Sequence, residues 1–404
     1  MKYIKLWICL GAVFSLANMA HAAGYQLNEY SAANMGRSFA GMGVVGDDFS
    51  AIGYNPAGMS INKTSGAQVG ASLVAVHSDY RGTDGAGRSG RDHSLIARVM
   101  PSGFVQYKLN DNLTAGLGVY VPFGLATDYD NNWFGSRHGT LSEITNVDIS
   151  PALAYRFNKY FSVGASINAQ NSSARLTSAS SELKGDDWGV GYTVGMTIHP
   201  LDNLRFGLSY RSKIGHQLKG HALVGGAIYR PIHAKITTPE TAILSGAWDI
   251  SPRWTLTGTA RWTRWKRFDT LNLISPAFSI ATRGMTDTIS TEEKWRNTGF
   301  YALGVDCKPN QRWTFRTGIA YDMTVIRSEA HRTPRIPDGR RFWGSLGVSY
   351  TYQNMQFDVG YSHIWVVGGH AEGTDSLNLA QGARPNIKYS SDANMLSVGF
   401  QYKF

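Results

Sequence analysis

Residues 396–404, LSVGFQYKF, end the chain and carry the pattern that decides its fold. Apolar or aromatic side chains alternate with small or polar ones, and the last residue is the aromatic Phe404. Because successive side chains of a β-strand point to opposite faces, this period of two predicts a strand with one apolar and one polar face. Such strands are typical of a barrel with lipid outside and a polar lumen inside.

The same alternation recurs upstream from about residue 66. It is clear in 204–211 (LRFGLSYR), 254–263 (WTLTGTARWT), 313–322 (WTFRTGIAYD) and 355–362 (MQFDVGYS). Short and long connections alternate between these segments, as periplasmic turns and external loops do in outer-membrane barrels. A soluble β-sandwich would explain the alternation of side chains but not the alternation of loop lengths. The short connections are 110–112, 158–159, 201–202, 251–252, 309–310 and 353–354, and the long ones 81–96, 125–145, 172–186, 213–239, 268–292, 326–339 and 369–390.

Six short and seven long connections join fourteen strands. The sequence therefore predicts an all-β fold, a 14-stranded antiparallel transmembrane β-barrel over residues 65–404. Composition agrees, since the mean hydropathy is −0.23 and no apolar run after the N-terminus reaches the ~20 residues that a membrane helix needs. With 12% aromatic and 17% charged residues, the chain is also unlike a disordered one.

The first residues predict export. Lys2 and Lys5 precede an apolar stretch, 6–17, and Ala20-His21-Ala22 has the form of a cleavage site. This is the pattern of a signal peptide, which we assign to residues 1–22. Of the two cysteines, Cys9 would leave with it, so no intramolecular disulfide is expected.

Residues 23–64 lack the alternation and are rich in Gly and Ala, which predicts a partly helical hatch that plugs the lumen. They contain a G-x-G-x-x-G spacing, Gly41 to Gly46. A dinucleotide site needs this spacing between a strand and a helix within a βαβ unit, and no such unit surrounds it. We therefore interpret it as tight turns, and expect no nucleotide cofactor and no nucleic-acid partner.

Several stretches resemble the FadL-like family of long-chain fatty-acid outer-membrane transporters. The similarity begins at 23–31 (AGYQLNEYS) and includes Gly36-Arg37-Ser38, Asp47-Asp48 and Asn55-Pro56-Ala57. It continues through 123–127 (FGLAT), 208–212 (LSYRS), 313–320 (WTFRTGIA), 336–338 (IPD) and 341–343 (RFW), and so covers essentially all of the mature chain.

This resemblance implies a plugged barrel in the outer membrane of a Gram-negative bacterium, which moves hydrophobic molecules passively. It implies capture among the external loops, a tighter site beside the mature N-terminus, and lateral exit at a kink in the third strand that faces the Asn-Pro-Ala element. The residues carried over are Ala23, Gly24 and Tyr25 for ligand binding, and Asn55, Pro56, Ala57, Pro122, Phe123 and Gly124 for the gate.

Two features bear on these implications. Pro122 lies inside a strand pattern and removes a ladder hydrogen bond, which favours a bulge or gate over an ordinary strand end.

The third external loop, 172–186, is short where the archetype of the family has a long insertion. Long-chain fatty acids are the expected ligand, and aromatic hydrocarbons or other apolar nutrients are the alternative. A general porin is less favoured because of the hatch.

The fourth long connection, 213–235, is basic and apolar and has no acidic residue. It would suit an anionic amphiphile bound by Lys219, Leu223 and Ile228, or contact with lipopolysaccharide and outer-membrane lipid. Its three histidines have no familiar metal-ligand spacing, so no metal is expected. The absence of G-x-S-x-G and H-E-x-x-H favours a protein that is not an enzyme.

Two further interpretations concern single residue types. The lumen-facing Arg156, Arg205, Arg211, Arg261 and Arg316 would either guide an acid or, as we favour, form a network with Asp148, Asp322 and Asp358. The terminal strand ending at Phe404 resembles the signal that the barrel-assembly machinery reads, so this machinery is an expected partner.

Overall fold

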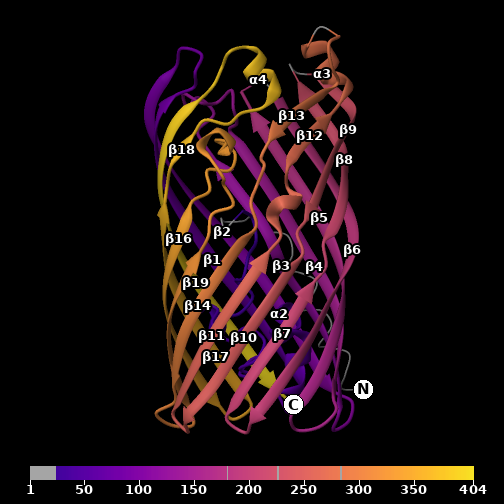
Figure 1. Cartoon of the computed structure of the whole chain (residues 1–404), viewed down its shortest axis with the longest axis vertical. Coiled ribbons are helices and arrows are strands. Elements are labelled where there is room, and N and C mark those ends of the chain that lie inside the picture. The colour runs from indigo at the N-terminus through magenta and orange to yellow at the C-terminus, as the bar shows by residue number, and fades with distance from the viewer. Residues whose placement is uncertain (1–23, 180, 225–226, 283) are drawn as a thin grey trace, which may run out of the picture.

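The computed structural model describes residues 24–179, 181–224, 227–282 and 284–404. Over these residues, fourteen antiparallel strands close into one barrel where β1 meets β19, as predicted (Figure 1). The assigned signal peptide and Ala23 lie outside the described residues. The barrel strands are β1 (Gly66–Thr83), β2 (Ser89–Lys108), β3 (Leu113–Asp128), β4 (Leu141–Arg156), β5 (Phe161–Ser178), β6 (Ser181–Leu201), β7 (Leu204–Arg211), β10 (Thr241–Ser251), β11 (Trp254–Thr263), β14 (Thr298–Cys307), β15 (Trp313–Asp322), β16 (Arg340–Tyr352), β17 (Met355–Val367) and β19 (Asn386–Lys403).

The two ends of the barrel differ as the loop pattern predicted. Short turns join strands at one end, and longer segments with added elements stand at the other (Figure 1). No helix in the described part of the chain is long and apolar enough to cross a membrane. The added elements are β8 (Ile214–Val224), β9 (Ala227–Thr238), η3 (Trp265–Arg267), β12 (Thr270–Ile274), α3 (Pro276–Ala281), β13 (Thr288–Glu292), η4 (Glu329–His331), β18 (His370–Ala371) and α4 (Ser376–Ala380).

Three of the predicted external loops are mostly strand. β1 and β2 stay paired up to Thr83 and Ser89, β5 and β6 up to Ser178 and Ser181, and residues 214–238 form the β8–β9 hairpin. The sequence pattern missed these extensions because a hairpin beyond the bilayer still satisfies its backbone by pairing but no longer needs an apolar outer face.

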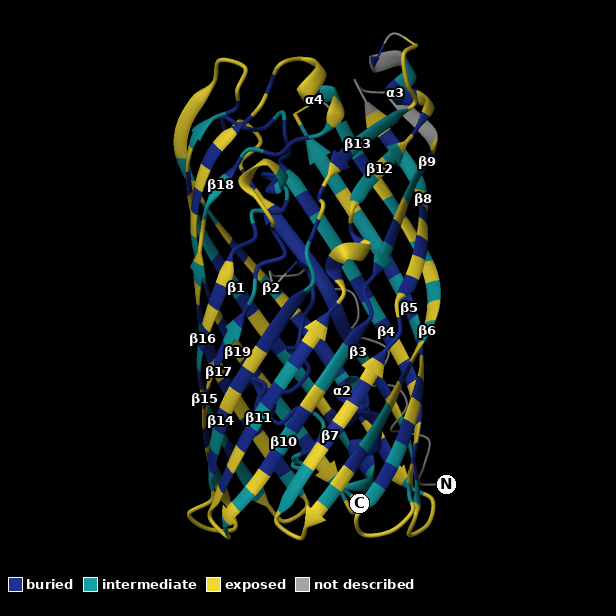
Figure 2. Cartoon of the chain, viewed as in Figure 1, coloured by how far each residue is buried: buried dark blue, intermediate teal, exposed yellow. Residues whose placement is uncertain are grey.

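Burial follows the predicted alternation through the barrel wall (Figure 2). In β11, Trp254 and Trp262 are exposed on the outer face, whereas Thr257 and Arg261 are buried on the inner face. The outer side chains are left exposed by the protein because lipid is their solvent in such a barrel, and many of the inner ones pack on the hatch.

The hatch, residues 24–64 in the described chain, fills the lumen with short helical pieces. These are α1 (Ala32–Met35), α2 (Ala51–Tyr54) and the 3-10 helix η2 (Pro56–Ser60). Gly41, Gly43 and Gly46 have φ values of 76°, 71° and 76°. Because side chains disfavour these left-handed conformations, the G-x-G-x-x-G spacing serves tight turns, as the sequence predicted.

Buried charges fasten the hatch to the wall. Arg37 is fully buried, and its guanidinium contacts Asp306 on β14 at 2.5 Å and Asp47 of the hatch at 2.8 Å. Arg316 on β15 reaches the same Asp47 at 2.8 Å. Next to these pairs the two backbones touch, since a Cβ on Gly318 would lie 2.3 Å from the carbonyl carbon of Arg37.

The predicted arginine network is present only in part, since the ion pairs identified among the described residues include neither Arg156 nor Arg261. Arg211 pairs with Asp148 at 2.7 Å, as expected. Arg205 pairs instead with Asp249 at 2.9 Å, and Arg316 pairs with the hatch. Sequence alone could not identify the acidic partners of Arg316. Asp47 is 269 residues away in the chain, and Asp306, which is 10 residues away, lies on the neighbouring strand.

We expect Arg37→Met to loosen the hatch. Removing one partner of a buried ion pair leaves uncompensated charge, which typically costs about 3–5 kcal/mol. The measurement is thermal unfolding in detergent together with limited proteolysis of residues 24–64. Lys108→Met, which removes an exposed pair with Asp111, is the control and should change neither. Equal protease resistance in Arg37→Met and the unmodified protein would contradict this role.

Candidate functional site

The wall has a break between β2 and β3. The two strands pair from Lys108–Thr114 to Gly103–Val119, and no pairing between them is recorded beyond that point in the described chain. In β3 the register with β4 shifts between Tyr120 and Phe123, so β3 carries an extra residue there. Pro122 lies in this bulge and has no N–H to donate, which is the local reason for the break.

The beginning of the hatch occupies the edge of β3 that β2 leaves. The Leu27 amide donates to the Pro122 carbonyl at 2.9 Å, and the Gly124 amide donates to the Tyr25 carbonyl at 2.6 Å. Gln26 lies opposite Phe123 as an isolated bridge. Segment 25–27 thus supplies the hydrogen bonds that a neighbouring strand would otherwise provide.

We call the stretch where the described residues of β2 and β3 are not paired the window, and the hatch lies on its inner side. Gly103–Val119 pairing marks its lower edge, and an ion pair between Arg98 on β2 and Asp128 on β3, at 3.7 Å, crosses above it. Behind it, the Ser102 hydroxyl donates to the Tyr30 carbonyl at 2.9 Å. The hatch therefore covers the unpaired stretch of β2 and β3 from inside the barrel.

Tyr25 is the centre of an aromatic cage. Its ring centroid lies 4.7 Å from Trp265, 5.7 Å from Phe268, 5.8 Å from Trp295 and 5.9 Å from Phe123. The Tyr25 hydroxyl is buried and has no hydrogen-bond partner among the described residues. The cage therefore has aromatic surface and two polar atoms without a partner among the described residues, the Tyr25 hydroxyl and the Trp265 indole nitrogen.

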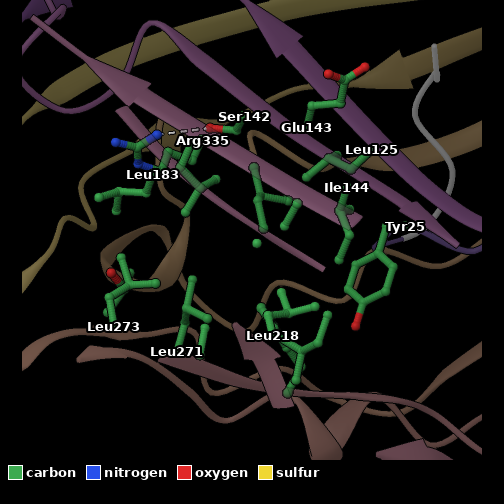
Figure 3. A pocket seen from close by; sticks show the side chains of 18 of the residues that line it. Tyr25, Leu125, Ser142, Glu143, Ile144, Leu183, Leu218, Leu271, Leu273 and Arg335 are labelled. Atoms are coloured by element: carbon green, nitrogen blue, oxygen red, sulfur yellow. Dashed lines mark hydrogen bonds between the residues drawn. The ribbon is translucent and has the colours of Figure 1, made fainter. Parts of the chain in front are cut away.

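An apolar cavity extends from this cage between the wall and the β8–β9 hairpin (Figure 3). It offers about 90 Å³ to the centres of water-sized molecules. Leu271 and Leu273 lie across it from Leu183, and Tyr25 and Arg335 stand at different sides of it (Figure 3). Other apolar side chains that line it are Leu125, Ile144, Ala174, Leu176, Leu218, Ile232, Ala234, Ile236, Phe268 and Ile336.

One cation in this cavity lacks an ion pair with any described residue. The Arg335 guanidinium donates through Nη1 to the Ser142 hydroxyl at 3.1 Å and to the carbonyls of Thr177 at 3.1 Å and Leu141 at 3.3 Å. All three partners are neutral. A guanidinium with only neutral partners in an apolar cavity can bind an anionic group strongly.

Glu293 lines the same cavity and is nearly fully buried. Its Oε2 accepts a hydrogen bond from the Trp295 indole at 3.0 Å. Burial raises the pKa of the Glu293 carboxyl to about 8, although the charge of Arg335 acts in the opposite direction. Near neutral pH the carboxyl is thus mostly protonated and does not cancel the charge of Arg335.

The predicted ligand residues divide between places inside and outside this cavity. Tyr25 lines it, and Gly24 packs behind the cage, where a Cβ would lie 2.8 Å from Trp295. Lys219 and Leu223 are exposed on the hairpin face that carries neither Leu218 nor Ile232, so the structure does not bring them to the cavity. The side chain of Ile228 and residue Ala23 lie outside the described part.

The Asn-Pro-Ala element lies against a different part of the wall from the one implied. The Asn55 amide donates to the Met196 carbonyl on β6 at 3.1 Å, and Gly195 and Gly207 leave the room it needs. Pro56 and Ala57 pack on Gly164 of β5. The expectation that this element faces the bend at Pro122 is therefore wrong for Asn55, because the contacts of Asn55 are with β6 and β7. Its role in gating stays a prediction.

Sequence reasoning missed Arg335 and the indoles of the cage. Trp265 follows β11, where the alternation ends, and Trp295 precedes β14. The sequence did contain one signal for the two indoles. Each lies just outside one of two strands that pair with each other, so both indoles emerge at the same rim of the barrel. Arg335 had no such signal.

Comparison with known proteins agrees with this architecture. Residues 13–404 match the family described as "Outer membrane protein transport protein (OMPP1/FadL/TodX)". A putative outer membrane protein of Neisseria meningitidis serogroup B is 29% identical, over 99% of this chain and 98% of that protein. The long-chain fatty acid transport protein of Escherichia coli K12 is 25% identical, over 87% and 90%.

A solved structure is similar throughout. The crystal structure of a Pseudomonas aeruginosa FadL homologue superimposes with a TM-score of 0.84 at 25% identity, covering 95% of this chain and 100% of that one. The resemblance inferred from sequence is thereby confirmed. The chain belongs to the OMPP1/FadL/TodX family, as a β-barrel of the bacterial outer membrane that transports hydrophobic compounds and is not an enzyme.

Proposed function

We propose that this transporter carries long-chain fatty acids passively through the outer membrane. The ligand is captured in the apolar cavity with its carboxylate on Arg335, and its chain lies toward the cage around Tyr25. It then passes the hatch and leaves sideways between β2 and β3. Its own concentration gradient drives the movement.

Arg335 is the reason why we favour a fatty acid as the ligand. The cavity is lined by apolar side chains, which suit any hydrocarbon chain, and it contains a guanidinium whose described hydrogen-bond partners are all neutral. An aromatic hydrocarbon would cover this cation without pairing it, and desolvating an unpaired charge is unfavourable. A carboxylate would pair it, so the acid is favoured over the alternative of aromatic hydrocarbons.

Two observations support the sideways exit. The hatch fills the lumen below the cavity, with Arg37, Asp306 and Asp47 buried in the contact. In the wall, in contrast, the described parts of β2 and β3 are not paired with each other beside Pro122. A route into lipid also spares an apolar chain from entering a water-filled pore, which costs hydrophobic free energy. A general porin for polar solutes does not fit this closed lumen.

Arg335→Gln should weaken binding of oleate and spare that of oleyl alcohol. The glutamine keeps a polar group on a shorter side chain and loses the charge. A hydrogen bond to a charged group is worth about 1.5–3 kcal/mol, or roughly tenfold or more in Kd. Fluorescence quenching of the cage tryptophans in detergent would measure both. Lys235→Gln, on an exposed hairpin position, is the control. An equal loss for the alcohol would exclude charge recognition by Arg335.

Binding of the acid should also weaken at alkaline pH. Because the pKa of Glu293 is raised to about 8 by burial, ionisation above that pH adds a negative charge beside the ligand carboxylate. Arg335, Lys184, Glu143 and Tyr25 are the other ionisable groups that line the cavity. Titration of the oleate Kd from roughly pH 6 to pH 9 should show the loss, and Glu293→Gln should abolish it. A pH profile unchanged by this substitution would refute the assignment.

Deletion of Val121 tests the exit. It removes the extra residue between Tyr120 and Phe123, so that β3 can continue its ladder and close the window. We expect oleate uptake by intact cells to fall to the background of cells that lack the protein, while oleate binding to the purified barrel persists. Deletion of Asn112 in the periplasmic turn serves as the control for loss of one residue. Undiminished uptake after Val121 deletion would rule out this exit.

A further inference from the structure

A second, smaller cavity lies on the inner side of the β3 bulge. Gln26, Asn28 and Tyr30 of the hatch line it on one side, and Pro122 and Phe123 of the bulge line it on another. The rest of its wall comes from β6, β7, β10 and β11, including Arg211 and Arg261. Its lining is thus polar and cationic where that of the upper cavity is apolar.

Arg261 is the less neutralised of the two arginines. It is 4% exposed, one of its amino groups donates to the Asn28 side-chain oxygen, and its guanidinium lies 4.8 Å from the centre of the Phe300 ring. Its Nε has no hydrogen-bond partner in the described part of the chain. No ion pair identified among the described residues includes it, although the negative charges of Asp322 and Glu29 attract it.

Arg211 brings a second positive charge to the same space. Its ion pair with Asp148, at 2.7 Å, neutralises one charge, and it also lies 5.7 Å from the centre of the Phe123 ring. Its Nε, like that of Arg261, is buried without a hydrogen-bond partner among the described residues. The two guanidiniums therefore bring buried N–H donors without hydrogen-bond partners among the described residues to this space.

Segment 25–27 separates this cavity from the upper one. Tyr25 lines the apolar cavity, and the next residue, Gln26, lines the cationic one. Gln26 is held by side-chain hydrogen bonds with Thr263 at 2.7 Å and Thr241 at 3.3 Å. On its other side the cationic cavity reaches Tyr30 and Pro122, which border the window. It thus lies between the ligand cavity and the exit.

We infer that Arg261, assisted by Arg211, forms a transit site for the carboxylate of the transported acid between Arg335 and the window. This inference rests on the proposed function and adds a second site to it. In the present conformation the space has room for roughly one water-sized group. A carboxylate head is larger than one water, so the head and its chain enter only when segment 25–27 leaves the edge of β3.

The transit site lowers the free-energy barrier to passage of an acid from Arg335 to the window and has no effect on a neutral molecule. An ionised carboxylate that leaves Arg335 would otherwise cross the interior unpaired, which carries a large desolvation cost. The guanidiniums at Arg261 and Arg211 accept the charge within the barrel, since charge-assisted hydrogen bonds replace those lost at Arg335. A fatty alcohol of the same length makes no such demand.

The test compares initial uptake of oleate and oleyl alcohol by cells that make the unmodified protein or Arg261→Gln. We expect Arg261→Gln to lower oleate uptake about tenfold, with alcohol uptake and the oleate Kd of the purified protein unchanged. Arg261→Lys, which keeps the charge but not the planar fork, should restore part of the oleate uptake. It also serves as the test variant if Arg261→Gln assembles poorly, and then a loss specific to oleate is expected.

Two results would overturn the inference. One is normal oleate uptake in both Arg261 variants. The other is an equal loss of acid and alcohol uptake, which would mean that Arg261 only holds the hatch through Asn28. Failure of the proposed function looks different, because the unmodified protein would then bind or take up no oleate, or Arg335→Gln would leave oleate binding intact.

Discussion

The structure depends on one constraint, that backbone N–H and C=O groups facing lipid must find partners within the protein. β1 pairs with β19 along eighteen residues to close the ladder. Between β2 and β3 the ladder ends at Gly103–Val119, and segment 25–27 takes over hydrogen bonds beside Pro122. The break is tolerable because the hatch covers it from inside. The hatch is therefore part of the wall at this place as well as a plug.

The hatch has a fixed side and a side that meets the window. Arg37 ties it to β14, and Gly36 and Gly347 bring its backbone onto β16 at a distance no side chain would permit. At the window it is held by a few backbone hydrogen bonds, by the side chain of Gln26 and by the packing of Tyr25 in the aromatic cage. Rearrangement of segment 25–27 costs far fewer contacts than movement of the whole hatch. In the proposed function, a small local change would therefore join the ligand cavity to the exit.

The site joins two kinds of environment in sequence order along the hatch. Tyr25 lies among aromatic rings in an apolar cavity, and Gln26 and Asn28 border buried arginines. An amphiphile needs both, since its chain gains free energy in the first and its head keeps hydrogen bonds in the second. The strand-like pairing of residues 25–27 with β3 sends alternate side chains to the two sides.

The sequence by itself determined the barrel, its fourteen strands, the short turns and the break at Pro122, because alternation and proline act within a few residues. It also singled out Tyr25, through resemblance. Only the tertiary structure decided which face of 213–235 lines the cavity, since the paired hairpin turns Leu218 toward the cavity and Lys219 outward. It also decided the position of Asn55, the packing of Trp265 and Trp295 on Tyr25, the place of Arg335 in the cavity, and the pairing of Arg37 with Asp306. These are contacts between residues far apart in the chain, which closure of the barrel brings together and local pattern does not record.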